Sequence, residues 1–410
     1  MSSAKNRYLI IIILGALSTI SPFAIDMYLP AFPELATALH TSTPRVQLSI
    51  VSYFAGFSIG QLIYGPLLDR FGRKRPLYAG LALFVVASVL CMYSQNVKFL
   101  IAMRFVQAIG GCSAGVASMA MVRDFFHVDE TAKIISMLIL ILSVSPFLAP
   151  SVGYYVAWHL GWRWVFVLLA AFALLMLIVC RLCLPEGHKS DNTVSLKPMP
   201  IIRNYLEVLK EPQFLTYALA GSFAFAGLLV YVSSSPIIFR EVFHVSGGQF
   251  SLIFATMAVG FIGANQVNVF LLRKFSSAQI FYATLLVECP VVLFFLIGTY
   301  FNWLGLPAVM ALLFIVLSSL GLAYPNAAAL AVVPFDHNIG SASAMLGFLQ
   351  IGIAVLAASV IGLTNSHTMT PVALLVAVTS WIGLAILIIG KRRIGQLRYV
   401  EEKGANFLSH

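Results

Sequence analysis

Long apolar stretches separated by short polar segments run along the whole chain. A helix needs about 20 apolar residues to cross the hydrocarbon core of a bilayer. The pattern predicts twelve such helices, at 8–30, 46–66, 77–95, 98–122, 133–157, 162–184, 213–238, 248–271, 277–300, 305–333, 338–364 and 370–390. We therefore predict an all-α membrane protein with twelve transmembrane helices.

The first stretch needs a separate argument, because Lys5 and Arg7 give it the basic flank of a secretory signal peptide. It is longer than such a signal and has no convincing small-residue cleavage site before Asp26. We interpret 8–30 as the first transmembrane helix.

Lysine and arginine are enriched in the cytoplasmic loops of membrane proteins. If both termini are cytoplasmic, 20 of the 25 basic residues fall on the cytoplasmic side. The other five are Arg45, Lys98, Arg104, Arg163 and Arg240. This asymmetry predicts a multi-pass protein of a bacterial inner membrane with both termini inside.

The longest polar segment, 185–212, lies between the sixth and seventh predicted helices. It predicts an N-terminal six-helix bundle (1–184), a cytoplasmic central loop (185–212) and a C-terminal six-helix bundle with a short cytoplasmic tail (213–410). Two bundles that rock around a central site are typical of secondary transporters. A helical membrane protein without a transport role is the alternative.

Composition excludes several other classes. The chain is 60% hydrophobic and 10% charged, whereas soluble proteins are about 25% charged. The net charge of +10 lies in short loops rather than on one face, which argues against nucleic-acid binding. The cysteines lie in or beside apolar runs, and the CxxC spacing of Cys180 and Cys183 lacks a second pair, so we expect no metal. We also expect no cofactor, because no phosphate-binding Gly-x-x-x-x-Gly-Lys-[Ser/Thr] string is present.

The loop after the second predicted helix, 65–75, carries a distinctive pattern. Gly65 should let neighbouring helices approach closely, and Gly72 should permit a tight reversal. Asp69 and Arg73 are spaced to pair across the turn. The other basic residues of the loop also fit an ordinary cytoplasmic anchor.

This loop resembles motif A of the major facilitator superfamily. Helix 98–122 resembles motif B through Arg104, Gln107, Gly110 and Gly111. Helix 133–157 resembles the antiporter motif C through Pro146, Pro150 and Gly153, with Ser145 at the usual leading glycine. Segments 24–30, 122–124, 231–236, 340–344 and 348–350 resemble the Bcr/CflA drug-resistance group.

The resemblance implies the major facilitator fold and a proton-coupled multidrug efflux antiporter that works by alternating access. Two features depart from the family. The second copy of motif A is reduced to Arg273-Lys274-Phe275, and the acidic residue often found near the end of the tenth helix is replaced by valine, which leaves Asp336 as the nearest acid.

Three charged residues lie well inside apolar spans: Asp26, Arg104 and Glu288. Each costs on the order of 3 kcal/mol to bury alone. Helix rise places Asp26 and Arg104 in the same outer half of the membrane, so we predict one proton-coupling network, which the resemblance extends to Gln107. The alternatives are a water-exposed helix end for Asp26 and a purely structural ion pair for Arg104. For Glu288, on a peripheral helix, we favour a protonated or locally paired carboxyl over a coupling role.

At the cytoplasmic side we predict a charge relay of Asp69, Arg73 and Asp124. The resemblance places Asp69 near the start of the eleventh helix, at Gly340 and Ser341, where it would latch the outward-facing state. The full predicted gate is Gly65, Asp69, Arg70, Gly72, Arg73 and Asp124, and the predicted hinge is Pro146, Pro150 and Gly153.

The resemblance also implies a cavity lined by aromatic and weakly polar side chains. The candidate substrate-binding residues are Tyr28, Tyr53, Phe57, Tyr231, Asn265, Gln266, Asn326 and Gln350. We expect drug-like small molecules, protons and membrane lipid as partners, no nucleic acid, and a monomer. A proton-coupled transporter of one metabolite, such as an amino acid or a small peptide, is the main alternative. A membrane enzyme is disfavoured, because the histidines are scattered at loops and ends.

Overall fold

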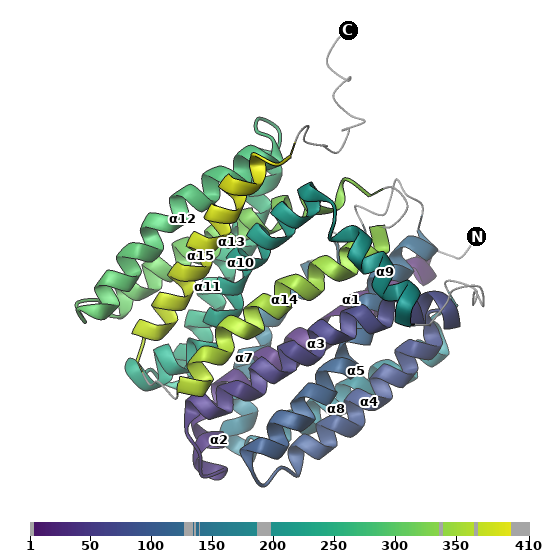
Figure 1. Cartoon of the computed structure of the whole chain (residues 1–410). Helices are drawn as coiled ribbons and strands as arrows, with labels where there is room; N and C mark the ends of the chain where they lie inside the picture. Colours follow the sequence, from purple (N-terminus) through teal and green to yellow (C-terminus); the bar gives the residue numbers. More distant parts are fainter. Residues whose placement is uncertain are drawn as a thin grey trace.

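The computed structural model describes residues 4–126, 134, 137–138, 140–186, 198–335, 339–364 and 368–394. Within them the chain forms helices throughout (Figure 1). In the N-terminal half these are α1 (Ala4–Asp26), the 3-10 turn η1 (Leu29–Ala31), α2 (Phe32–Ala38), α3 (Thr43–Phe71), α4 (Lys74–Met92), α5 (Val97–Phe125), α7 (Ser145–Leu160) and α8 (Arg163–Cys183).

The short helix α9 (Pro198–Val208) follows in the predicted central loop. The C-terminal half contains α10 (Pro212–Pro236), the π-helical turn η2 (Ile237–Val242), α11 (Gly247–Leu271), α12 (Ser277–Tyr300), α13 (Leu306–Val332), α14 (Ile339–Thr364) and α15 (Thr370–Lys391). Twelve helical stretches among the described residues are long and apolar enough to cross a membrane. The predicted all-α fold with twelve spans is confirmed.

Most helix boundaries lie close to the predicted ones, although α3 runs from Thr43 to Phe71 where 46–66 was predicted, and the first and fifth predicted helices are interrupted. The first predicted helix, 8–30, ends at Asp26, and the chain continues through η1 and α2. The start of the fifth, at 133, lies outside the described residues; α7 begins at Ser145, just after a turn at Val144. Both interruptions lie beside proline, which removes a backbone hydrogen-bond donor.

The helices of each half pack mainly on one another, α1 with α5, α7 and α8, and α10 with α13, α14 and α15. The halves meet where α3 packs on α14 and α7 packs on α11. The start of α1, helix α9 and the end of α15 lie at the same end of the bundle (Figure 1). The limits 1–184, 185–212 and 213–410 stay predictions.

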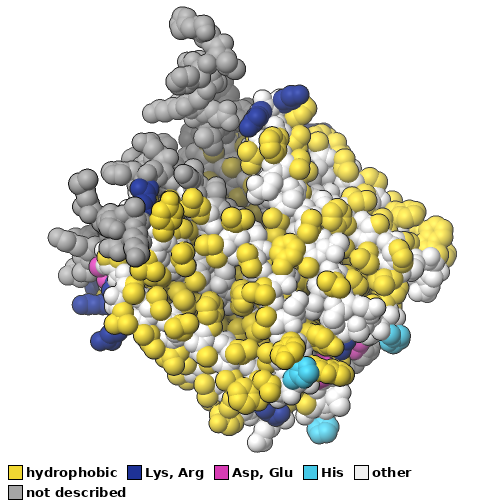
Figure 2. Space-filling model, turned by 180° about the vertical axis from the view of Figure 1, so that it is seen from behind, with side chains coloured by type: hydrophobic (Ala, Val, Ile, Leu, Met, Phe, Trp, Pro, Cys, Tyr) yellow, Lys and Arg dark blue, Asp and Glu magenta, His cyan; other side chains and the backbone are white. Residues whose placement is uncertain are grey.

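The outer surface is largely apolar. Seen from behind, hydrophobic side chains cover the middle of the face, and charged side chains lie near its edges (Figure 2). Leu182, Leu363 and Trp158 are among the large apolar residues that are more than two-thirds exposed. A surface of this kind is suited to lipid as its solvent.

Inside the bundle, small residues let helices pack closely. A Cβ atom added at Gly110 of α5 would lie 2.6 Å from the Gly80 carbonyl oxygen of α4. A Cβ atom added at Gly153 of α7 would lie still closer to the Met27 carbonyl oxygen, directly after α1. Such contacts take the place of hydrophobic driving force between helices in lipid. They position the end of α1 against α7.

Candidate functional site

Asp26 is the last residue of α1, and its side chain is buried. The Ser145 hydroxyl, at the first turn of α7, donates a hydrogen bond of 3.1 Å to Asp26 Oδ2. The water-exposed helix end that the sequence left open is excluded, because only 8% of the residue is accessible. The serine that replaces the usual glycine of motif C is thus a direct partner of the carboxyl.

Arg104 lies in α5 and is completely buried. Its Nη2 donates to the Ala24 carbonyl oxygen at 3.0 Å, and its Nη1 donates to Gln107 Oε1 at 2.6 Å. Gln107 Nε2 in turn donates to Ser88 Oγ of α4 at 2.6 Å. The chain of bonds ties α1, α4 and α5 together.

Three aromatic rings surround the guanidinium of Arg104. Its carbon lies 4.3 Å from the ring centre of Tyr53, 4.7 Å from that of Tyr28 and 5.8 Å from that of Phe166. A desolvated cation–π contact contributes about 2 kcal/mol. We call Arg104, Gln107 and these three rings the arginine cage. It stabilises a buried cation for which the described residues provide no ion pair.

The predicted network of Asp26 and Arg104 is therefore indirect. The described ion pairs do not join the two side chains. Arg104 binds the backbone two residues before Asp26, and Asp26 binds Ser145. The cage fixes the last turn of α1, and the carboxyl at its end is bonded to Ser145 rather than to Arg104.

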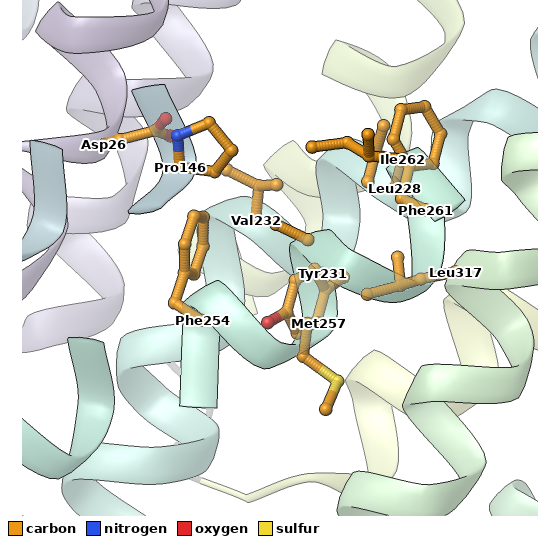
Figure 3. A pocket seen from close by; sticks show the side chains of 11 residues that line it. Asp26, Pro146, Leu228, Tyr231, Val232, Phe254, Met257, Phe261, Ile262 and Leu317 are labelled. Carbon is orange, nitrogen blue, oxygen red and sulfur yellow. The ribbon is translucent and has the colours of Figure 1, made fainter. Parts of the chain in front are cut away.

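A cavity of about 120 Å³ opens beside Asp26, between the two halves of the protein. Asp26 and Pro146 lie at one end, and side chains of α10, α11 and α13 form the rest (Figure 3). Its lining residues are Asp26, Pro146, Leu228, Tyr231, Val232, Phe254, Met257, Ala258, Phe261, Ile262 and Leu317. Among them, Asp26 is the one carboxyl and Tyr231 carries the one hydroxyl. We call this cavity the Asp26 pocket.

Tyr231 is the one predicted substrate-binding residue in this lining. It is 3% exposed, and its hydroxyl has no hydrogen-bond partner in the described part of the chain. Its ring stacks on Phe254 at 6.1 Å between centres. The hydroxyl is available to a bound molecule.

The other predicted binding residues lie elsewhere. Tyr28 and Tyr53 belong to the arginine cage, and Asn326 donates a 2.7 Å hydrogen bond to Asn268, between α13 and α11. Gln266 is exposed and Gln350 is buried. Phe57 and Asn265 are partly buried and do not line the pocket.

The α11 residues of the pocket were not predicted. One face of the helix carries them at three- and four-residue spacing: Phe254, Met257, Ala258, Phe261 and Ile262. Since α11 is apolar on its other faces too, this spacing does not stand out in the sequence.

The motif A loop forms an ionic cluster at one end of the bundle. Arg73 Nε donates to Asp124 Oδ2 at 2.8 Å, and Arg73 Nη1 donates to Asp69 Oδ1 at 2.8 Å. Burial alone would lower the pKa of the Arg73 guanidinium, but its hydrogen bonds to Asp124 and Asp69 outweigh burial and raise that pKa. The structure thus brings Asp69, Arg73 and Asp124 together at the junction of α3, α4 and α5.

Glu186, which sequence reasoning missed, completes this cluster. Its carboxylate accepts hydrogen bonds from the backbone N–H groups of Arg73 at 2.8 Å and Lys74 at 3.2 Å. A carboxylate at a helix N-terminus is favoured by the helix dipole. The first residues of the central segment therefore cap α4.

Two residues of the predicted gate do not make the predicted contacts in this structure. A Cβ added at Gly65 would meet nothing within 4 Å, so Gly65 marks no close helix contact here. Among described residues, Asp69 is hydrogen-bonded to Arg73 and its side chain is 57% exposed, with no bond to the start of α14. Gly72 does adopt a φ of 79°, the left-handed region that a tight reversal requires. The guanidinium carbon of Arg70 lies 5.8 Å from the ring centre of Phe71. The side chain of Arg123 and the whole of Asp336 are outside the described part of the chain.

Contacts between the halves close the end of the bundle beyond Asp26. Gln47 Nε2 of α3 donates to Ser233 Oγ at 3.2 Å and Ser234 Oγ at 3.0 Å, both in α10. Arg240 of η2 lies 3.7 Å from Glu34 of α2. Near the middle of α3 and α14, Ser58 Oγ donates to the Phe348 carbonyl oxygen at 3.0 Å.

These features together define a helical membrane transporter, with two packed halves and a small cavity that contains a buried carboxyl between them. The family model of the Major Facilitator Superfamily matches residues 14–359. The chain belongs to this superfamily.

Related proteins extend over nearly the whole chain. The uncharacterized MFS-type transporter YdgK of Bacillus subtilis (strain 168) is 31% identical over 401 residues, which are 96% of this chain and 98% of that protein. The bicyclomycin resistance protein homolog of Haemophilus influenzae is 30% identical over 90% of this chain and 93% of its own length. The multidrug resistance protein MdtL of Shewanella oneidensis is 27% identical over 90% of this chain and 92% of its length.

Solved structures support the same fold. A D-xylose–proton symporter superposes with a TM-score of 0.75 at 17% identity, over 95% of this chain and 99% of that one. A bacterial homolog of the lysosomal transporter Spinster, inward-facing and occupied, has a TM-score of 0.70 at 15% identity, over 98% of this chain and 100% of that one. At these identities the likeness shows the fold alone.

Proposed function

We propose that this protein is a proton-coupled multidrug efflux antiporter of a bacterial inner membrane, with both termini in the cytoplasm. Relatives named for bicyclomycin and multidrug resistance support drug export. They favour it over the alternative, a transporter of one metabolite. A susceptibility panel in an efflux-deficient host separates the two, because multidrug export raises resistance to several unrelated compounds.

The observation that carries the proposal is the position of Asp26. It is a buried carboxyl that lines a cavity between the two halves, where the other lining residues except Tyr231 are apolar. An intramembrane carboxyl in a cavity is a typical proton carrier. Proton and drug would occupy the same small space in turn, so that binding of one releases the other.

Alternating access follows from the size of that space. Sites for drug-sized ligands are about 300–1,000 Å³, whereas the Asp26 pocket is about 120 Å³. The cavity therefore has to widen before a drug enters. Widening at the end beyond Asp26 would break the contacts of Gln47 with Ser233 and Ser234 and of Glu34 with Arg240.

The arginine cage would position the carboxyl. Arg104 holds the Ala24 carbonyl oxygen in the last turn of α1, and Gly153 packs on the backbone directly after Asp26. The turn at Val144 and the prolines at 146 and 150 make α7 a hinge beside the same carboxyl. A rocking movement of α7 would then move Ser145 relative to Asp26 and favour proton release or uptake.

The motif A cluster would serve as the gate at the cytoplasmic end. It joins the ends of α3, α4 and α5 through Arg73, and Glu186 adds the central segment. A latch between Asp69 and the start of α14 would form in another state of the cycle, since this structure leaves Asp69 more than half exposed.

The deciding experiment measures proton release from purified protein. The protein is placed in weakly buffered detergent solution with a pH-sensitive dye, and bicyclomycin or ethidium is added. We expect the wild type to release protons and Asp26→Asn to release none. Glu288→Gln is the matched control, because it removes the second buried carboxyl of the described membrane-spanning helices, which lies outside the pocket. Equal release from wild type and Asp26→Asn would refute the coupling role of Asp26.

A further inference from the structure

A second hollow lies on the outside of the C-terminal half, where α11 ends and α12 begins. Its volume is about 520 Å³, within the range of ligand sites and larger than the Asp26 pocket. It is lined by Leu271, Phe275, Gln279, Ile280, Ala283, Thr284, Val287, Ser319 and Leu322. We call it the α11–α12 groove.

The groove opens to the outside of the bundle rather than to the interface between the halves. Phe275 is 50% exposed and Val287 is 57% exposed. Helix α12 lies at the edge of the molecule (Figure 1). One of its few polar groups, the Thr284 hydroxyl, already bonds to the Ile280 carbonyl oxygen at 2.7 Å. The chemistry of the lining suits a hydrocarbon chain.

One end of the groove is strongly basic. Arg273 and Lys274 lie between two of its lining residues, Leu271 and Phe275, and both are exposed. Neither makes an ion pair with a described residue. On the neighbouring face of α12, Lys391 of α15 lies with its Nζ 4.2 Å from the ring centre of Tyr282. No acidic residue occurs in 271–283 or 387–394.

We propose that the α11–α12 groove is a binding site for an anionic phospholipid. One acyl chain would occupy the apolar groove, and the phosphate would lie at Arg273 and Lys274. Basic side chains at the cytoplasmic end of transmembrane helices attract anionic headgroups, so this assignment rests on the proposed orientation of the chain. A lipid site would give a role to Arg273 and Lys274, which stand where a second motif A is expected. Among the described residues, these two side chains form no ion pairs like those of Arg73 with Asp69 and Asp124.

The occupant is a lipid rather than a transported drug for two reasons. The groove faces the bilayer and is separate from the Asp26 pocket, with which it shares no lining residue. It also combines an apolar channel with a basic end, which matches a molecule that has a long chain and an anionic head.

The test is lipid binding to the purified full-length protein in detergent, followed by native mass spectrometry. The probes are dioleoyl-phosphatidylglycerol, which is anionic, and dioleoyl-phosphatidylcholine, which has the same chains and no net charge. With two basic groups at the headgroup, we expect a preference for phosphatidylglycerol on the order of tenfold.

Two pairs of variants test the contacts of the lipid headgroup and those of the acyl chain separately. Arg273→Gln with Lys274→Gln should remove the preference, whereas Arg45→Gln with Lys98→Gln, which removes two exposed charges at the opposite end, should keep it. Ala283→Phe should fill the groove and weaken binding of both lipids, whereas Leu286→Phe, exposed on the same helix but outside the groove, should not. Equal binding of the two lipids by the wild type, or an unchanged preference in the first pair, would overturn the proposal. Proton release through Asp26 is measured separately and does not depend on this result.

Discussion

Asp26 and Glu288 are two buried carboxyls in the membrane-spanning part of one chain, and their immediate surroundings are alike. Each is less than 10% exposed, and each accepts one hydrogen bond from a serine hydroxyl on another helix. Ser145 donates to Asp26 at 3.1 Å, and Ser380 of α15 donates to Glu288 at 2.6 Å.

The two carboxyls differ in whether they line a cavity. Asp26 lines a cavity between the two halves, beside a turn in α7. Glu288 lies between α12 and α15 within one half, and it lines neither the Asp26 pocket nor the α11–α12 groove. The two carboxyls thus differ in their access to a cavity rather than in their burial. We predict that this access, and not burial alone, distinguishes the proton carrier.

The largest effect is expected from Asp26→Asn. Asparagine keeps the size of the side chain and can still accept the Ser145 hydrogen bond, but it has no group that titrates and can carry a proton. Drug resistance in an efflux-deficient host should be abolished while the amount of protein in the membrane, measured by immunoblot, stays the same. Glu288→Gln should retain resistance. Loss of resistance in Glu288→Gln at normal protein levels would show that the second carboxyl also takes part in coupling.

Arg104→Lys should have the next largest effect. A lysine ammonium lacks the planar fork that reaches Ala24 and Gln107 together, and it stacks less well among the rings of the cage. We expect transport to fall strongly and the unfolding free energy to fall by about 2 kcal/mol, measured as a lower melting temperature in detergent. Arg163→Lys is the control, because that exposed guanidinium contacts a single ring, that of Trp162. Wild-type transport by Arg104→Lys would mean that the cage does not position Asp26.

Asp69→Asn removes an exposed carboxylate of the proposed gate, in contrast to the buried carboxyls of Asp26 and Glu288. Arg73 keeps Asp124 as a partner, so the protein should remain folded, and the stability change should be at most about 1 kcal/mol. Transport should nevertheless fall, because the proposed gate loses one of its charges. Glu207→Gln removes the carboxylate of another exposed ion pair with the same spacing, Arg203–Glu207, and should leave transport unchanged. Normal transport by Asp69→Asn would reject the gate.

The smallest effects are expected from replacing the serines that donate to the two carboxyls, Ser145 and Ser380. These variants compare the role of the same hydrogen bond at Asp26 and at Glu288. Ser145→Ala and Ser380→Ala each remove one hydrogen bond to a carboxyl, which contributes about 1 kcal/mol. Ser145→Ala should change the pH dependence of transport, since its hydroxyl contacts the proposed proton carrier. Ser380→Ala should lower the melting temperature and leave the pH profile of transport unchanged. Identical pH profiles for both variants and the wild type would separate Ser145 from coupling.

Much of the architecture could be predicted because a bilayer restricts the options. Backbone polar groups in lipid have to be satisfied within the helix, and the hydrocarbon thickness sets the helix length. The twelve apolar stretches therefore correspond to twelve membrane-length helical stretches among the described residues, with interruptions where α1 ends at Asp26 and where α7 begins after the turn at Val144. The pairing of Asp69 with Arg73 and the tight reversal at Gly72 could also be predicted, since both are properties of one short loop.

The composition of the Asp26 pocket was much less predictable. Of eight candidate residues for binding, Tyr231 lines it, whereas Tyr28 and Tyr53 surround Arg104 instead. In a soluble helix the polar face marks the outside, but a membrane helix such as α11 is apolar toward both lipid and protein. Gly65 illustrates the same limit, because a glycine permits a close contact without indicating that one exists.

Local chemistry and membrane thickness thus determined the helices, the family motifs and the presence of a carboxyl and a guanidinium within apolar spans. The packing of helices distant in sequence determined that Asp26 contacts Ser145 rather than Arg104, that Glu186 caps α4, and that α11 forms one wall of the pocket. The reason is physical. Contacts along one helix follow from spacing, whereas contacts between helices depend on which of several equally apolar faces meet.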